Sequence, residues 1–108
     1  METDEIKQYL HDWYNVREGK NYDYTEGGCL EILIECGRDE IVTDRTKHRW
    51  WDEVTTIAKF GEKYFEYVYA EANRDESVQD LGWDFDWGSV SEVESYEETV
   101  VVRKWRTI

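Results

Sequence analysis

The sequence predicts an α+β domain in which an antiparallel sheet of three or four strands packs with one or two helices. Three observations predict this class: a helical apolar periodicity close to the N-terminus, two alternating segments joined at Gly61 and Glu62, and a β-branched run close to the C-terminus. The chain has 108 residues, which is enough for one hydrophobic core, so we expect residues 1–108 to form a single domain.

The N-terminal segment has the pattern of an amphipathic helix. Thr3 is expected to cap a helix over residues 4–16, because acidic residues in the first turn favour the positive end of the helix dipole. The apolar residues recur at spacings of three and four, as one helical face requires: Ile6, Tyr9, Leu10 and Trp13. A polar loop is predicted to begin at Gly19.

Residues 29–36 are ambiguous. Apolar residues alternate with glutamates as in a strand, but Leu33 interrupts the alternation. The same residues also fit a helical face that would end before Gly37. We therefore predict a helix over residues 25–36 and keep the strand as the alternative.

Residues 50–72 are predicted to form a β-hairpin around which the fold is built. A two-residue loop with glycine first, Gly61-Glu62, is typical of a type II′ turn. The turn fixes the register, so one face of the hairpin is nearly all apolar and the other is mixed. The expected pairs on the apolar face are Phe60 with Lys63, Ala58 with Phe65, Thr56 with Tyr67 and Val54 with Tyr69.

The remaining segments connect or extend this hairpin. Residues 40–43 are expected to form a short extended piece and residues 44–49 a polar connector. Residues 73–88 break the alternating pattern. From Val93 onward, β-branched residues and alternation through Thr107 predict a long strand that lies antiparallel beside residues 63–70.

The chain is strongly acidic, with 26 acidic against 13 basic residues and a formal net charge of -13. Such a field repels nucleic acids and anionic membranes and attracts basic surfaces, so neither nucleic acid nor membrane is expected as a direct partner. Aromatic residues make up 16% of the chain, which argues against disorder. The acidic start lacks an apolar run and no stretch approaches the length of a membrane span, so we expect a cytoplasmic protein.

No motif in the sequence predicts catalysis, a metal or a cofactor. Zinc-type spacing is absent from the residues that would have to converge, Cys29, Cys36, His11 and His48, and both thiols are expected to be reduced and buried. The run Asp84-x-Asp86-x-Gly88 lacks the glycine and glutamate positions of an EF-hand. Nucleophile-elbow and phosphate-loop motifs are also missing, so we expect a protein that is not an enzyme.

The stretch over residues 75–98 has nine acids and no lysine or arginine. One interpretation is a solvated loop and strand edge with its aromatic residues turned into the core. The other is an acidic face, anchored by tryptophan, that meets a basic groove built for nucleic acid. The candidate partner-binding residues are Asp75, Glu76, Asp80, Trp83, Asp84, Asp86, Trp87, Glu92, Glu94, Glu97 and Glu98.

Three short runs carry a resemblance: His48-Arg49-Trp50-Trp51, Lys63-Tyr64-Phe65, and Glu92-Val93-Glu94 followed by Tyr96-Glu97 and Thr99. Over residues 47–106 the chain resembles small acidic proteins, themselves uncharacterised, that tailed phages and prophages encode. In size and charge alone it is also similar to phage anti-defence proteins, including anti-CRISPR proteins that occlude a DNA-binding groove. The resemblance supplies no catalytic residues.

The sequence therefore leads to a functional hypothesis with one alternative. The hypothesis is a phage-derived inhibitor whose acidic face blocks a basic nucleic-acid-binding surface of a host defence complex, CRISPR or other, without chemistry. The alternative is a small structural or accessory phage protein, for instance a homodimer, whose acidity serves only solubility.

Overall fold

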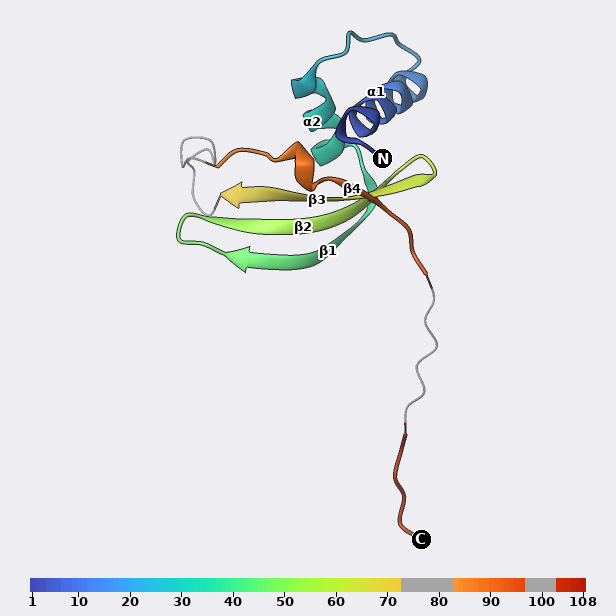
Figure 1. The fold of residues 1–108 in the computed structure, drawn as a ribbon, viewed down its shortest axis with the longest axis vertical. Helices are drawn as coiled ribbons and strands as arrows, with labels where there is room; N and C mark the ends of the chain where they lie inside the picture. The colour runs from blue at the N-terminus through green and yellow to red at the C-terminus, as the bar shows by residue number, and fades with distance from the viewer. Residues whose placement is uncertain (73–82, 97–102) are drawn as a thin grey trace.

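The structure, a computed structural model, describes residues 1–72, 83–96 and 103–108 and has the predicted α+β class (Figure 1). Two helices precede a four-stranded antiparallel sheet whose strands lie in sequence order, β1-β2-β3-β4. The elements are α1 (Thr3–Glu18), α2 (Glu26–Glu35), β1 (Arg38–Lys47), β2 (Trp51–Phe60), β3 (Lys63–Ala72), the 3-10 helix η1 (Trp87–Ser89) and β4 (Ser91–Val93).

Both predicted helices are present, and local capping explains where they begin. Glu2 takes the N-cap position of α1 that the sequence assigned to Thr3, and its backbone N–H donates to Glu5 Oε1 at 3.3 Å. At the start of α2, Thr25 Oγ1 accepts a hydrogen bond from the Gly28 N–H at 3.0 Å. The ambiguous segment is thus helical, because a capped apolar face outweighs the interrupted alternation.

The central hairpin has the predicted register. Gly61 has φ 70°, as the first position of a type II′ turn requires, and all ten residues of β2 pair with β3. Val54 lies opposite Tyr69 and Ala58 opposite Phe65, as expected. Buried residues alternate along β2, so one hairpin face belongs to the core and the other is partly exposed.

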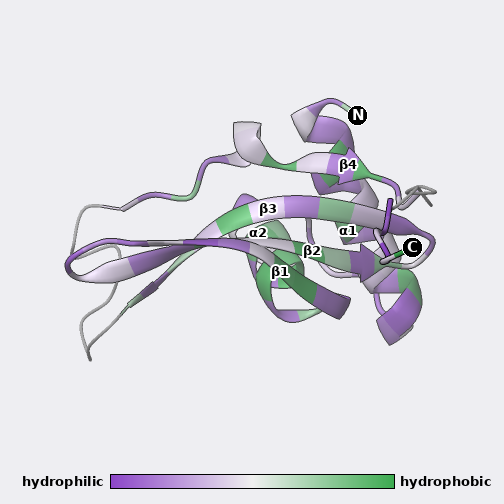
Figure 2. Ribbon diagram, turned by 90° about the horizontal axis from the view of Figure 1, so that it is seen from below, coloured by the Kyte–Doolittle hydropathy of each residue, from purple (hydrophilic) through white to green (hydrophobic). Residues whose placement is uncertain are grey.

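The core lies between this hairpin face and the two helices. Its members are the buried residues Ile6, Leu10, Ile32, Leu33, Ala58, Phe60, Phe65, Tyr67 and Val90. Tyr9 of α1 ties the layers together, since its hydroxyl donates to the Phe60 carbonyl at 2.7 Å. The helices cover the part of the sheet nearest the β2–β3 turn, and the β1–β2 end projects past them (Figures 1 and 2).

The prediction for residues 40–49 is correct only in part. Residues 40–43 are extended, as expected, but residues 44–47, which were predicted as a connector, continue the same ten-residue strand, β1, and only residues 48 and 49 lie outside it. Two register shifts interrupt its pairing with β2, and all of its residues are exposed, so it lacks the hydrophobic alternation of a typical strand. Bulges and charged residues are common on such edge strands because they discourage pairing with another chain.

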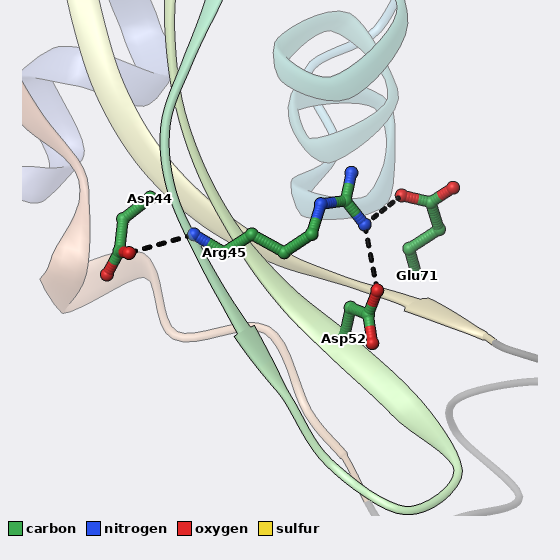
Figure 3. Close-up of polar contacts among 4 residues, drawn as sticks. All are labelled: Asp44, Arg45, Asp52 and Glu71. Atoms are coloured by element: carbon green, nitrogen blue, oxygen red, sulfur yellow. Dashed lines mark hydrogen bonds and ion pairs between the residues drawn. The ribbon is translucent and has the colours of Figure 1, made fainter.

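Arg45 explains how this polar strand is held to the sheet (Figure 3). Asp52 of β2 and Glu71 of β3 lie directly opposite each other, an arrangement in which like charges repel. The Arg45 guanidinium lies 2.9 Å from Asp52 Oδ2 and 3.3 Å from Glu71 Oε2, so one cation bridges three strands. The hydrogen bond to Asp52 raises the pKa of Arg45, which stays charged.

The long strand predicted from Val93 onward is not confirmed by the described residues, because β4 ends at Val93, where the predicted strand begins. β4 has three residues and pairs with β3 only at Tyr64, Phe65 and Glu66. Residues 103–108, which were expected to continue the strand, are exposed and have no regular structure. The Val100–Val102 part of the prediction lies outside the described residues.

Thr56 supplies a test of the core, since it is 1% exposed and its Oγ1 has no hydrogen-bond partner among the described residues. We expect Thr56→Val to raise the free energy of unfolding by about 1 kcal/mol, because a methyl group would replace a buried, unpaired hydroxyl. Urea denaturation followed by circular dichroism measures the change. Thr55→Val, on the half-exposed face, is the matched control and should alter stability little. A loss of stability in Thr56→Val would mean that the hydroxyl is paired.

Candidate functional site

The described residues contain six of the eleven candidate partner-binding residues. Trp83, Asp84, Asp86, Trp87, Glu92 and Glu94 are placed. The other candidates, Asp75, Glu76, Asp80, Glu97 and Glu98, lie outside the described residues. The acidic face is therefore assessed from its described part.

The two candidate tryptophans do not project as anchors. Trp83 and Trp87 are half-buried and flank Phe85, whose ring centroid lies 6.2 Å from that of Trp83 and 5.3 Å from that of Trp87. Phe85 and Trp87 pack against the core, and Lys7 Nζ lies 5.1 Å from the Trp87 ring. Phe85 and Trp87 extend the core, which agrees with the inward orientation considered for them, and half-buried Trp83 contacts the Phe85 ring.

Two of the four described acids have partners within the protein. Asp86 Oδ1 accepts a hydrogen bond from the Gly88 N–H at 2.9 Å and so caps η1. Glu92 pairs with Lys63 at 3.0 Å. Asp84 and Glu94 are exposed and form no ion pair with a described residue. Of the four, only Asp84 and Glu94 can therefore bind a partner without breaking a contact within the described part of the protein.

The fold places three of the four described acids of this stretch in two groups and adds an acid to each, whereas Asp86 belongs to neither group. Asp84 lines a hollow of about 270 Å³ together with Glu26 of α2. Glu92 and Glu94 line another of about 620 Å³ together with Glu62 of the β2–β3 turn. Each group is partly neutralised, because Lys7 lies 2.8 Å from Glu26 Oε1 and Lys63 lies 3.0 Å from Glu92 Oε1.

A third hollow, which the sequence did not predict, lies between α1 and α2. It has a volume of about 390 Å³, and three carboxylates, Asp23, Glu31 and Glu35, line it without any lysine or arginine. Its apolar lining includes Tyr14 and Tyr22, whose ring centroids are 5.8 Å apart. The hollow offers a cation both negative charge and aromatic surface. We call it the acidic pocket.

The charges of α2 are unfavourable for the isolated helix. Glu31 and Glu35 are four residues apart, where like charges cost roughly 0.2–0.5 kcal/mol. Glu35 also lies in the last turn, at the negative end of the helix dipole, and that turn contains no basic residue. The spacing of these glutamates was the sequence signal for the acidic pocket, but it has meaning only once the segment is known to be helical.

The chemical groups considered from the sequence show no arrangement for catalysis. Cys29 is buried and Cys36 half-buried, both are free thiols, and burial raises the pKa of each. Such thiols are protonated and weakly nucleophilic near neutral pH. Within the described residues, histidine, cysteine and carboxylate side chains form no cluster of three or more that could hold a metal ion.

No helix among the described residues has both the length and the apolar character needed to cross a bilayer. Comparison of the chain with family models, curated proteins and solved structures found no match.

Proposed function

We propose that this protein is a binding protein that lays its acidic helical side on a basic, nucleic-acid-binding surface of another protein and blocks that surface. The observation that carries the proposal is the acidic pocket, where three carboxylates and two tyrosine rings line a hollow without any lysine or arginine in the lining, although Lys20 Nζ lies over the Tyr22 ring at 5.7 Å. An arginine or lysine side chain of the partner would fill it with its cation against the carboxylates and its stem against the rings.

The charge of the whole chain supports this kind of partner. A net charge of -13 steers the protein towards a basic surface and away from nucleic acid itself. A groove that normally holds phosphates presents arginine and lysine side chains, which carboxylates can engage in place of phosphate oxygens. The proposed partner class is therefore a nucleic-acid-binding protein or complex, and the mechanism is occlusion. The resemblance to phage-encoded proteins suggests that this partner is a defence complex of the host of a phage.

The unfavourable charges on α2 support placing the contact surface at the acidic pocket. Glu31 and Glu35 repel each other and oppose the helix dipole in the free protein. A cation bound between them would remove both penalties, so the interaction is stronger at this point than at an evenly charged surface. Asp84, next to Glu26, extends the acidic surface along the other side of α2.

The test is a capture experiment with three charge-reversal variants that change the net charge equally. The first is Glu31→Lys with Glu35→Lys, the second is Asp84→Lys with Glu94→Lys, and the control is Glu40→Lys with Glu66→Lys on the sheet. Asp86 and Glu92 are left unchanged because they have structural contacts.

We expect the wild-type protein to retain a nucleic-acid-binding complex from host lysate at low salt and to release it to duplex DNA. Reversal at Glu31 and Glu35 should weaken this binding about a hundredfold or more, since like charges brought together cost several kcal/mol, whereas the control should weaken it much less. Equal losses in all three variants would show only general attraction. A captured complex that still binds DNA would contradict occlusion, and an accessory protein would capture no such complex.

A further inference from the structure

This acidic protein also has a basic pocket. It has a volume of about 360 Å³ and is lined by Trp13, Arg17, Arg38, Asp39, Lys59 and Gly61. Its three cations come from three different elements, α1, β1 and β2, and Asp39 is the one acid in the lining. The lining is therefore positive, although the chain as a whole has a charge of -13.

Two of the three cations have no ion-pair partner in the part of the chain that the structure describes. Arg38 and Lys59 form no ion pair with a described residue, although acids outnumber bases two to one in the chain. They also lie directly opposite each other in the β1–β2 register, where like charges repel. Lys59 Nζ lies over the Tyr64 ring at 5.6 Å, and Arg17 is 3.7 Å from its neighbour Glu18. Arg38 and Lys59 thus bring positive charge to this pocket that no ion pair among the described residues neutralises.

The backbone beside the pocket has two irregular features of a kind that is frequent next to binding sites. The β1–β2 register shifts between Arg38 and Ile41, and Asp39, within that shift, has φ 53°. A bulge re-aims the side chains around it, and bulges are frequent next to binding sites. A non-glycine residue at positive φ carries strain that the surrounding structure must maintain. Both features lie at the beginning of β1, next to the position where Arg38 is paired with Lys59.

We propose that this basic pocket binds a small molecule that carries a phosphate group. The planar guanidinium groups of Arg17 and Arg38 donate paired hydrogen bonds to phosphate oxygens, and Lys59 adds a third cation. The volume exceeds that of a phosphate alone and lies within the range of small-ligand sites. Trp13 supplies apolar surface for the rest of the ligand. This site is separate from the acidic pocket and does not depend on the proposed function.

The experiment is a titration of the ¹⁵N-labelled protein with phenyl phosphate, followed by the backbone amides and the indole N–H signals. The Trp13 indole signal is assigned by its loss in Trp13→Phe. We expect saturable shifts at Trp13 and around Arg38 and Lys59, at lower concentrations for phenyl phosphate than for inorganic phosphate. Benzoate, with a single charge and two oxygens, should bind more weakly than phenyl phosphate.

Three variants distinguish a specific binding site from general electrostatic attraction of phosphate. Arg38→Gln and Lys59→Gln should each weaken phenyl phosphate binding at least about tenfold, the loss of one charge-assisted contact. Lys47→Gln removes the same charge from the far end of β1 and should change the affinity less than about twofold. Shifts that do not saturate, or an equal loss in Lys47→Gln, would overturn the site. Equal affinities for inorganic and phenyl phosphate would overturn the contact assigned to Trp13.

Discussion

Phe65→Ala is expected to lower the free energy of unfolding by about 3–5 kcal/mol, a large part of the stability of a small domain. Phe65 is fully buried at the centre of the sheet, and its ring centroid lies 5.7 Å from that of Tyr9 and 6.0 Å from that of Phe60. Truncation therefore removes contacts to α1 and to β2 at once and leaves a cavity that the paired strands cannot close. Urea denaturation followed by circular dichroism gives the difference.

Tyr64→Ala is the matched control for Phe65→Ala. Tyr64 is the preceding aromatic residue on β3, but its side chain lies on the other face and is half-exposed. We expect a loss of about 1 kcal/mol or less, because no enclosed cavity forms there. Comparable losses for the two variants would contradict the assignment of the core to one face of the hairpin.

Gly37→Ala is expected to destabilise the protein by about 1–3 kcal/mol through overpacking. A Cβ atom at this position would lie 2.6 Å from the Ala58 Cβ and 2.9 Å from the Phe60 Cζ. Both neighbours are fully buried within a paired strand, so neither has room to withdraw. A glycine is required here because the chain between α2 and β1 packs directly against Ala58 and Phe60 of β2. Thermal and urea denaturation both report the loss.

Two further variants isolate the steric cause. Gly27→Ala, inside α2, would place its Cβ with nothing within 4 Å and should stabilise the protein by about 0.5–1 kcal/mol. In an Ala58→Gly background, Gly37→Ala should cost clearly less than in the wild type, because the shortest contact is removed. An unchanged cost in that background would place the strain elsewhere.

The parts of the fold that were predicted correctly depend on local signals. The recurrence of Ile6 and Leu10 marks the buried face of α1, and the Gly61-Glu62 turn fixes the register of the hairpin over all ten pairs. β1 was recognised only as a short extended piece at residues 40–43, because its residues are exposed and its pairing is bulged, so neither hydrophobic alternation nor a clean turn marks its full length. Its identity as a strand follows from pairing with β2 and from the bridge that Arg45 makes.

The candidate site could be predicted only in part. The sequence marked the acids of residues 75–98. The structure places Asp84, Glu92 and Glu94 in two hollows and gives internal partners to Asp86 and Glu92. The sequence did not predict the acidic pocket, because Asp23 lies in a loop and the other two carboxylates, Glu31 and Glu35, are on a helix that could also have been a strand.

Local periodicity and turn chemistry in the sequence determined the class of this protein, the presence of α1 and the register of the hairpin, since each depends on residues close together in the chain. For α2 they favoured a helix but left a strand open. The tertiary structure alone decided which charges meet. Arg17, Arg38 and Lys59 are far apart in sequence and come together in one pocket only because the helices and the sheet pack on a shared core. Side chains converge through packing, and packing over such distances leaves no periodic signal in the sequence.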